Sequence, residues 1–275
     1  MAGTLYVVAT RLGNLEDITL RALRVLKEVD CIAAEDTRHS RKLLTHYGIA
    51  TPLTSYHDHV ESARAPRLVE RLKAGEDIAL ISDAGTPGIA DPGYRLVRAA
   101  IDAGLRVVPI PGPSAVIAGL SAAGVPTDGF VFAGFVPARS AARRSFFRGL
   151  RDEQRTVVCF EAGRRLAASL QDLVAEFGDR SLVVARELTK LYEDFQRDGA
   201  QALAARASDL AARGEVTLFI APAAAPTDTA SEEELRAAMA RLRAEGLHLK
   251  EIAKRLAKES GWSARDVYRL GLADR

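Results

Sequence analysis

The first 124 residues alternate short apolar runs with longer segments in which apolar residues recur every three to four positions. Short apolar runs predict buried strands, and a period near 3.6 predicts amphipathic helices. We expect strands at 4–9, 31–34, 78–81 and 106–110, and helices that open near 17, span 40–47, end at 68–72, and cover 94–103 and 114–123. Strands alternating with helices in this way are typical of a parallel α/β sheet.

The same pattern resumes after a cluster of turn residues at 124–129, which we interpret as a domain boundary. Beyond it the sequence predicts strands at 130–136, 156–160, 181–185 and 216–220, with helices at 166–177 and 201–212. The expected fold class is therefore α/β, with two α/β domains at 1–124 and 125–228. A helical C-terminal domain is expected at 229–275.

The C-terminal segment has the composition of a linker followed by short helices. Residues 222–229 are rich in Ala and Pro, and Ser231 is followed by three Glu residues, which predicts a capped helix start. Two further helices are expected at 247–260 and 264–270. Their spacing favours a helix-turn-helix that binds RNA, and a small helical bundle docked on the protein is the alternative.

Composition excludes several classes of protein. Of the 275 residues, 48% are hydrophobic and 27% charged, as in ordinary globular chains. The longest apolar runs are far shorter than the roughly 18 to 20 residues that span a bilayer. The first residues lack the pattern of a secretory signal. Cys31 and Cys159 lie in apolar runs, which suits reduced thiols. We therefore expect a cytoplasmic protein without a membrane segment.

The net charge of +2 hides local basic clusters. Residues 139–155 carry six Arg against one Asp and one Glu, with Phe146 and Phe147 among them, a mixture that suits phosphate contact and base stacking. A solvated helix face over a Phe core contact is the alternative. The predicted RNA-binding cations are Arg11, Arg38, Arg139, Arg143, Arg144, Arg148, Lys250, Lys254, Arg255 and Arg265.

Two loops at strand ends are candidates for binding a small ligand. The chain has no GxxxxGK[ST], no GxGxxG after its first strand and no CxxC, so the common phosphate and zinc motifs are missing. The loop 83–93 is longer than a usual βα connection and carries three Gly, two Pro and two Asp residues. Loops at the carboxyl ends of strands are where open α/β sheets bind ligands. Ser114, after the next strand, either joins this site or only caps the following helix.

Five motifs in this order and spacing identify a resemblance to a known family. They are Ala9–Leu15, Ala34–Arg38, Asp83–Gly93, Pro111–Ser114 and Arg186–Lys190. Together they closely resemble the bacterial ribosomal RNA small subunit methyltransferase I family, which belongs to the tetrapyrrole-methylase-like enzymes that use S-adenosyl-L-methionine. The resemblance covers residues 4 to about 220, and the C-terminal extension also looks like that of the family.

The resemblance implies that S-adenosyl-L-methionine lies in the cleft between two α/β domains of a homodimer. It also implies methylation of a cytidine ribose 2′-hydroxyl in the decoding region of 16S rRNA, within the small ribosomal subunit. The implied cofactor-binding residues are Leu12, Asp83, Ala84, Gly85, Thr86, Ser114, Ala115, Phe160, Glu161 and Ala185. Two positions depart from the family pattern: Arg11 replaces a proline, and Ala162-Gly163-Arg164 replaces Ser-Pro-His.

Methyl transfer from a sulfonium is an in-line displacement, so we expect neither a metal nor a covalent intermediate. A base or a cation near the ribose hydroxyl should assist, and the candidates are Glu35, Asp36, Glu187 and Lys190. For each of these, an ion pair or a helix cap is the alternative role. Two other functions stay open: a corrin-type tetrapyrrole methyltransferase, and a non-catalytic nucleic-acid-binding protein built around the C-terminal helices.

Overall fold

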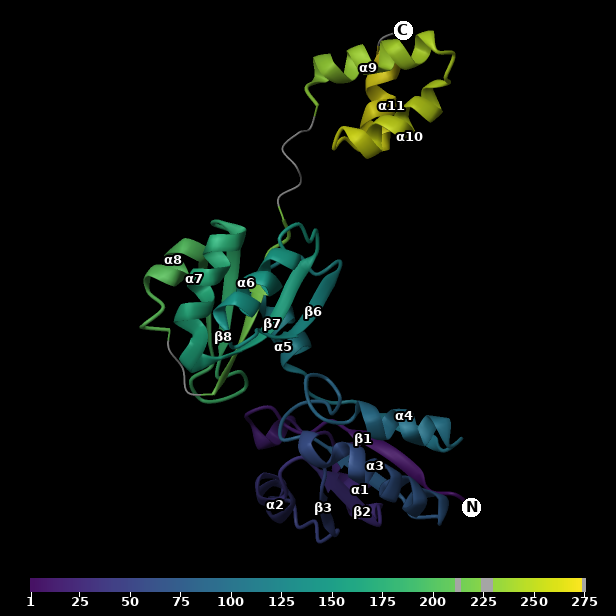
Figure 1. The fold of residues 1–275 in the computed structure, drawn as a ribbon, viewed down its shortest axis with the longest axis vertical. Helices are drawn as coiled ribbons and strands as arrows, with labels where there is room; N and C mark the ends of the chain where they lie inside the picture. The colour runs from purple at the N-terminus through teal and green to yellow at the C-terminus, as the bar shows by residue number, and fades with distance from the viewer. Residues whose placement is uncertain (211–213, 224–229, 274–275) are drawn as a thin grey trace. The chain divides into compact units, whose positions relative to one another are not determined.

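The computed structural model describes residues 1–210, 214–223 and 230–273. The chain divides into two compact units, Met1–Pro222 and Ala223–Arg275. The larger unit contains two five-stranded sheets, each with its own helices (Figure 1). This agrees with the expected α/β fold class.

The first sheet is entirely parallel. Its strands are β1 (Thr4–Val8), β2 (Cys31–Ala34), β3 (Leu53–Ser55), β4 (Ile78–Ile81) and β5 (Arg106–Ile110), in the order β3-β2-β4-β1-β5. The helices between them are α1 (Leu20–Glu28), α2 (Thr37–His46), α3 (Asp58–Lys73) and α4 (Tyr94–Asp102). Every residue of β2 and β4 is buried, because helices cover both faces of the sheet.

Alternation along the central strands decides which helices cover which face. Ile32 and Ala34 share a core with residues of α1 and α2, whereas Ala33 between them packs with α3 and α4. Successive side chains of a strand point to opposite faces, so each of these short runs contributes to two cores. Because all strands of this sheet are parallel, the carboxyl ends of β1, β2, β4 and β5 lie together at one edge of the sheet.

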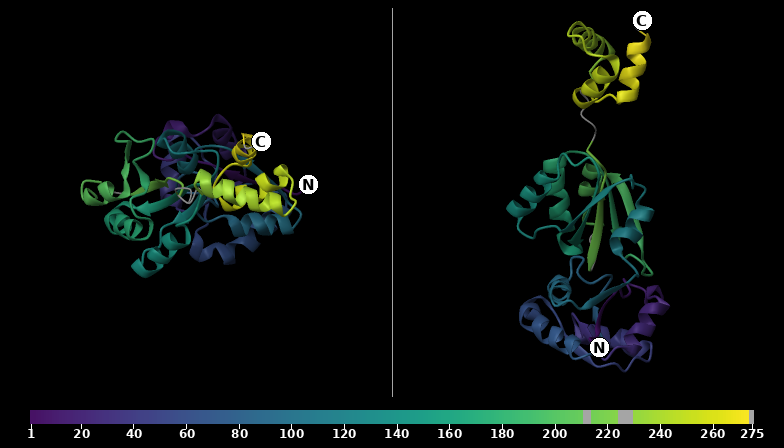
Figure 2. Two further views of the ribbon diagram at one scale, coloured as in Figure 1. Left: turned by 90° about the horizontal axis from the view of Figure 1, so that it is seen from above. Right: turned by 90° about the vertical axis from the view of Figure 1, so that its right-hand side faces the viewer.

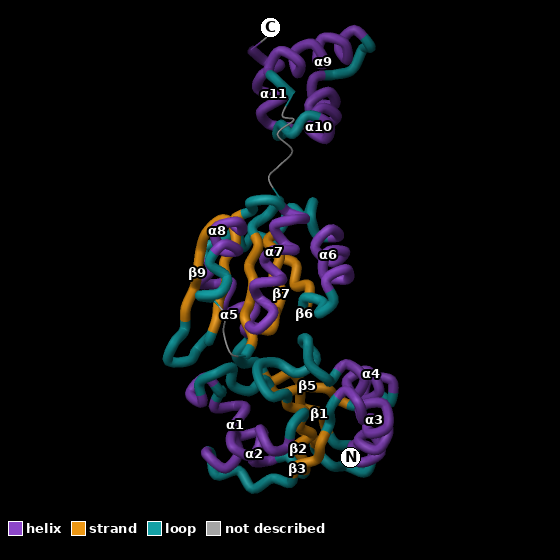
Figure 3. The backbone as a smooth tube through the Cα atoms, turned by 60° about the vertical axis from the view of Figure 1, so that its left-hand side comes forward, coloured by secondary structure: helices purple, strands orange, loops and turns teal. Residues whose placement is uncertain are grey.

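The second sheet is mixed. Its strands are β6 (Phe130–Phe135), β7 (Thr156–Ala162), β8 (Ser181–Arg186), β9 (Asp194–Gly199) and β10 (Glu215–Ile220), in the order β6-β7-β10-β8-β9. The edge strands β6 and β9 are labelled on opposite sides of the sheet in Figure 3. Only the β6–β7 pair is parallel, and the other three pairs are antiparallel. The associated helices are α5 (Ala115–Ala123), α6 (Ser140–Gly149), α7 (Leu166–Phe177) and α8 (Ala200–Ala205).

Helices cover both faces of the second sheet. Leu170 of α7 and Leu203 of α8 share a core with Phe147 of α6 and residues of β7, β8 and β10. On the other face, Val116 and Leu120 of α5 pack with Phe219 of β10. Because α5 directly follows the last strand of the first sheet, it brings the carboxyl edge of that sheet next to the second one.

The structure adds two strands that periodicity missed, β3 and β9, and shortens one predicted helix. Both strands are edge strands that pair on one side only, and β9 is mostly polar, so neither shows an apolar run. The helix expected at 201–212 is wrong in length, because α8 ends at Ala205 and gives way to turns. Part of that expectation, 211–213, lies outside the described residues, as does 224–229 of the linker predicted at 222–229.

The described residues of the smaller unit form three helices, α9 (Glu232–Ala244), α10 (Leu249–Glu259) and α11 (Ala264–Ala273), which pack on one another (Figure 2). Ser231 and Glu234 form the predicted capping box at the start of α9. Leu235 and Met239 of α9 share a core with Ile252 of α10 and Val267 of α11. Both helices of the predicted helix-turn-helix are therefore present, packed with α9 in a common core.

Candidate active site

A pocket of about 440 Å³ lies in the larger unit, where the carboxyl edge of the first sheet meets the second sheet. This volume is within the range of about 300–1,000 Å³ typical of sites for small ligands. The first sheet contributes residues that follow β1, β2, β4 and β5: Leu12, Glu35, Asp83, Ala84, Gly85, Thr86, Ile89, Asp91, Ser114, Ala115 and Val116. The second sheet contributes Phe135, Phe160, Ala185, Glu187, Leu188, Lys190, Gly214, Glu215 and Thr217.

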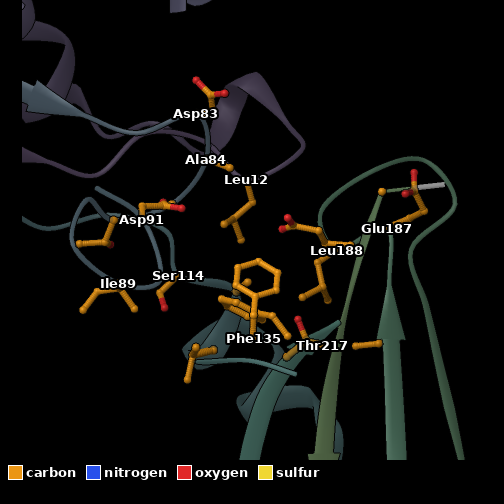
Figure 4. A pocket seen from close by; sticks show the side chains of 18 of the residues that line it. Leu12, Asp83, Ala84, Ile89, Asp91, Ser114, Phe135, Glu187, Leu188 and Thr217 are labelled. Carbon is orange, nitrogen blue, oxygen red and sulfur yellow. The ribbon is translucent and has the colours of Figure 1, made fainter. Parts of the chain in front are cut away.

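The floor supplied by the second sheet is one row of side chains across four adjacent strands. Phe135 pairs with Phe160, Phe160 with Thr217, and Thr217 with Ala185. Residues directly opposite one another in a sheet face the same side, so all four line the pocket. Figure 4 shows Phe135 and Thr217 converging with Leu188 toward Leu12. Sequence analysis missed Phe135 and Thr217, because only the strand register places them beside Phe160.

The same alternation removes Glu161 from the pocket, so the prediction that Glu161 contacts the cofactor is wrong. Its side chain is fully buried on the opposite face of β7, where it forms an ion pair of 2.6 Å with Arg165. It also accepts hydrogen bonds from the Ser169 hydroxyl of α7 and from its own neighbour's amide, Ala162 N. Glu161 is a structural residue that ties β7 to the start of α7.

The loop 83–93 is held in place by backbone pairing with the segment after β1. Thr10 N donates to the Gly85 carbonyl at 2.8 Å, and Gly85 N donates to the Arg11 carbonyl at 3.0 Å. Gly85 has a φ of +70°, in the left-handed region where only glycine is unstrained. The Arg11 guanidinium donates to the Asp83 carbonyl at 3.0 Å and contacts His39. Arg11 therefore braces this loop, a role that its predicted RNA contact did not include.

The residues after β2 divide into one that lines the pocket and one that does not. The carboxylate of Glu35 faces the pocket and accepts from Asp83 N at 3.2 Å. Asp36 instead caps α2, accepting from the amides of Arg38 and His39, and these two hydrogen bonds lower its pKa. Asp36 is exposed and does not line the pocket, which favours the helix-cap alternative, and its role as a general base stays a prediction.

The loop between β8 and β9 places the two remaining catalytic candidates side by side. Lys190 Nζ lies 3.1 Å from Glu187 Oε1, and both residues line the pocket. Glu187 and Thr189 have φ values of +52° and +64°, a strained conformation for residues other than glycine. Gly13 N donates to the Thr189 hydroxyl at 2.9 Å and so holds this loop against the loop after β1.

The pocket is rich in carboxylates, and two of them have raised pKa values. Burial raises the pKa of Asp91 to about 7, and the negative charge of Glu35 adds to this, whereas a hydrogen bond from Ser82 opposes it. Burial likewise raises the pKa of Glu215, an effect that Lys190 partly offsets. Clustered perturbed groups in a pocket are typical of functional sites. Asp91 belongs to the loop predicted to bind a small ligand, where its carboxylate suits hydroxyls or an ammonium. Glu215 was missed because its approach to the pocket depends on the tertiary structure.

Comparison with known proteins decides the family. A family model for tetrapyrrole (corrin/porphyrin) methylases matches residues 4–204. A Synechocystis sp. protein named "Ribosomal RNA small subunit methyltransferase I" is 47% identical over 98% of this chain and 98% of its own length. A Pseudomonas aeruginosa protein of the same name is 56% identical over 70% of this chain and 68% of its own. The chain belongs to the ribosomal RNA small subunit methyltransferase I family of tetrapyrrole methylases. The resemblance drawn from the five motifs is thereby confirmed.

Solved structures agree on the fold. Diphthine synthase superposes with a TM-score of 0.63 and 18% identity, covering 80% of this chain and 90% of that one. Uroporphyrin-III-C-methyltransferase from Thermus thermophilus gives a TM-score of 0.58 with 19% identity, covering 79% and 94%. As a member of its family, the chain is a methyltransferase that uses S-adenosyl-L-methionine. The non-catalytic interpretation is therefore wrong.

The pocket of this family member suits S-adenosyl-L-methionine chemically. That cofactor carries a sulfonium, an ammonium and a carboxylate together with a ribose and an adenine. Carboxylates such as Asp83 and Asp91 suit its cations and ribose hydroxyls, and Leu12, Ile89 and Phe160 provide apolar walls. Ser114 occupies the N-cap position of α5 but makes no capping hydrogen bond with its side chain, and it lines the pocket instead. The start of α5 therefore offers amide donors suited to an anionic group.

Of the residues implied by the resemblance, those that line this pocket are Leu12, Asp83, Ala84, Gly85, Thr86, Ser114, Ala115, Phe160 and Ala185. Their individual contacts with the cofactor stay predictions. Among the described residues, no group of three or more His, Cys, Asp or Glu side chains is arranged to hold a metal, and no helix is long and apolar enough to cross a membrane.

In the folded chain, several arginines of the basic stretch 139–155 form ion pairs with acidic residues of α7. Arg143 is only 5% exposed and pairs with Asp172 of α7 at 2.7 Å, while Phe147 is fully buried in the core. Arg144 and Arg148 both pair with Glu176 of α7 at 2.9 Å. The acidic partners lie about 30 residues later in the chain. A charge count over residues 139–155 alone therefore overestimated the positive charge of this surface. Arg143 and Phe147 are structural, and the predicted RNA contact of Arg143 is wrong.

The remaining RNA-binding candidates are at the surface. Arg38 on α2 and Arg139 before α6 are exposed, as are Lys250, Lys254 and Arg255 on α10 and Arg265 on α11. Arg144 and Arg148 keep 49% and 64% of their side-chain surface, so their outer atoms stay accessible beside Glu176. These residues remain predictions for RNA contact.

The raised pKa of Asp91 predicts a pH-dependent affinity for S-adenosyl-L-methionine. A cationic ligand favours the charged carboxylate, so binding releases a proton wherever Asp91 is protonated in the free enzyme. The affinity for S-adenosyl-L-methionine is expected to fall as the pH drops below about 7. Because one proton is released on binding, the loss of affinity approaches about tenfold per pH unit. Calorimetry from pH 5.5 to 7.5 measures this slope, and Asp91→Asn should remove it. An unchanged slope in Asp91→Asn would contradict the assignment.

The pH dependence that Asp91 gives to the stability of the ligand-free protein should be opposite to that of the affinity: the stability contribution grows as the pH falls. Its folded-state pKa is above the ordinary value near 3.9, so the folded form holds the proton more tightly. The resulting stabilisation is present below pH 4 and is lost as pH rises through 7. A denaturation series comparing wild type with Asp91→Asn isolates this contribution.

Glu61 of α3 anchors the far end of the loop 83–93. Its buried Oε1 accepts from Gly93 N at 3.0 Å, from Arg95 N at 3.3 Å and from the Tyr56 hydroxyl at 3.1 Å. We expect Glu61→Ala to weaken cofactor binding by about tenfold, because the buried Gly93 amide at the end of the loop loses its acceptor. Leaving a buried donor unpaired costs roughly 1–3 kcal/mol.

Glu61→Gln should restore most of this affinity, because its amide oxygen still accepts hydrogen bonds. Glu70→Ala, which removes an exposed partner of Lys73 on the same helix, is the matched control and should leave affinity unchanged. Calorimetric titrations of the three variants with S-adenosyl-L-methionine show whether the hydrogen bonds to Glu61 position the loop for cofactor binding. Equal losses in Glu61→Gln and Glu61→Ala would show that the hydrogen bonds do not position the loop.

Proposed function

We propose that this enzyme methylates the ribose 2′-hydroxyl of a cytidine in the decoding region of 16S rRNA. The observation that carries the proposal is the 47% identity to the Synechocystis relative over 98% of both chains, which includes the C-terminal helices. The fold neighbour uroporphyrin-III-C-methyltransferase shares only 19% identity, a level that indicates common fold alone. The rRNA substrate is therefore favoured over a corrin-type one.

The pocket contains groups suited to a hydroxyl acceptor. Bound S-adenosyl-L-methionine supplies an activated methyl group. Methylation of a ribose hydroxyl forms an ether and releases one proton, which the enzyme must accept or pass to water. Lys190 would stabilise the developing negative charge on the oxygen, and Glu187, 3.1 Å from its ammonium, would orient it. Glu35, which lines the pocket from the first sheet, is a candidate base for accepting that proton.

Alignment accounts for much of the expected acceleration. Holding a hydroxyl in line behind a methyl group is worth roughly 7–11 kcal/mol when the geometry is right. The rigid row of Phe160, Thr217 and Ala185 and the glycine-rich loop 83–93 would provide this alignment. Neither contribution requires a metal. We further propose that the enzyme acts as a homodimer in the cytoplasm, on assembled or nearly assembled small subunits.

Labelled S-adenosyl-L-methionine tests the proposal directly. The purified protein is incubated with small ribosomal subunits from a strain that lacks the corresponding activity, and the labelled nucleotide is mapped and hydrolysed. We expect one cytidine in the decoding region to carry a 2′-O-methyl group. Label on a base, label elsewhere in the RNA, or transfer to a tetrapyrrole in place of RNA would contradict the proposal.

A further inference from the structure

Helix α11 presents a mixed basic and aromatic stripe to solvent. Arg265, Tyr268, Arg269 and Leu272 are all exposed, with Tyr268 at 40% and Leu272 at 46%. These positions follow the spacing i, i+3, i+4 and i+7, which places them on one face of a helix. Val267, between them in sequence, is fully buried on the other face.

The inner face of α11 fixes the direction of this stripe. Val267 packs in the core with residues of α9 and α10. Gly271 lies so close to Met239 that an added Cβ would be 2.3 Å from its methyl carbon. Arg243 of α9 also donates to the Gly271 carbonyl at 2.6 Å. Rotation of α11 would break these contacts, so the stripe is a permanent surface of the unit.

The charge carried by α10 and α11 favours a polyanion. Residues 249–273 carry six Lys or Arg against three Asp or Glu. Lys250 and Lys254, one turn apart on α10, are exposed. Arg269 forms an ion pair with Asp266, whose carboxylate also accepts a hydrogen bond from the Ser263 hydroxyl. The Arg269 side chain is nevertheless 75% exposed. A partner helix would require a continuous apolar seam, whereas here the two apolar groups alternate with cations.

We propose that the face formed by Arg265, Tyr268, Arg269 and Leu272 docks an unpaired segment of the substrate RNA, with Tyr268 stacking on a base. The inference rests on the proposed rRNA substrate and adds how that RNA is recognised. Stacking on an aromatic ring requires a base that is free of its helix, and arginines on either side contact the flanking phosphates. The unit thus selects single-stranded or looped RNA over a continuous duplex.

Binding of the full-length protein to small subunits tests this inference. Base stacking is worth about 1–3 kcal/mol, so Tyr268→Ala should weaken binding by roughly 5- to 150-fold. Tyr268→Phe, which keeps the ring, should bind nearly as wild type does. Tyr94→Ala on α4, which removes a tyrosine that is 71% exposed in the other unit, is the matched control and should bind normally.

Further readouts separate the inference from its alternatives. Cofactor affinity and thermal stability should be unchanged in Tyr268→Ala, and its salt dependence should match that of wild type, whereas Arg265→Ala should reduce the salt slope. If wild type methylates small subunits and Tyr268→Ala binds them equally well, the inference is overturned and the proposed function stands. A change in oligomeric mass with normal RNA affinity would likewise overturn it. Failure of wild type to methylate any RNA would overturn the proposed function itself.

Discussion

Gly85→Val is expected to weaken S-adenosyl-L-methionine binding by about a hundredfold while the protein stays folded. A β-branched residue at a φ of +70° is strained by about 1–3 kcal/mol, and relief of the strain requires the loop to move. That movement breaks the hydrogen bonds from Thr10 N and to the Arg11 carbonyl, worth about 0.5–1.5 kcal/mol each. The added Cβ would also contact Leu12 Cδ2, at 3.4 Å, on the pocket wall.

Gly104→Val is the matched control for this prediction. Gly104 also has a φ of +70°, follows α4 and has no atom within 4 Å of an added Cβ. It should therefore carry a similar strain, visible as a lower melting temperature, with normal cofactor affinity. Calorimetric titration of both variants distinguishes a local effect from general destabilisation. Near-normal affinity in Gly85→Val would remove this loop from the cofactor site.

Lys190→Met is expected to lower the saturated methylation rate by at least about a hundredfold, with little change in cofactor affinity. The ammonium lines the pocket beside Glu187, where it would stabilise the alkoxide formed from the ribose hydroxyl. Loss of an acid–base or electrostatic contribution of this kind typically reduces the rate by a hundredfold or more. Methionine keeps much of the length of the side chain and removes only the charge and the donors.

Single-turnover rates at saturating small subunits, measured across pH, provide the test. The control is Lys73→Met, because Lys73 pairs with Glu70 at 2.9 Å with the same three-residue spacing on an exposed part of α3. If Lys190 only touches an RNA phosphate, the loss will appear in substrate affinity and its salt dependence, while the saturated rate is preserved. A normal saturated rate would disprove the catalytic assignment and leave Glu35 as the next candidate.

Much of the first sheet follows from local sequence, because its central strands are buried on both faces. Such strands must be short and apolar, so β2 and β4 were predicted at their observed bounds. The edge strand β5 was also predicted at its observed bounds, because its own sequence is largely apolar. The loop 83–93 was also singled out, because a long connection with three glycines and two prolines at a strand end suits a ligand site as well as an ordinary surface loop. The edge strands β3 and β9 were missed, because a strand that pairs on one side needs no apolar run.

Tertiary structure alone decided which polar residues face the pocket. Phe160 and Glu161 are neighbours in sequence, and the pleat of β7 sends one into the pocket and the other into a buried ion pair with Arg165. Thr217 and Glu215 reach the site through the register and position of β10, which no local signal encodes. Arg143 looked like a surface cation until α7 brought Asp172 beside it.

The sequence by itself therefore determined the family, the order of the main elements and loops that line the pocket. These features depend on residues close together in the chain: apolar runs, turn residues and motifs. The side-chain environment depends on pairs that are distant in sequence, such as Lys190 near Gly13 and Glu61 with Gly93. Burial, hydrogen bonding and pKa arise from those pairs, so only the folded chain shows which charges serve the site and which hold the structure together.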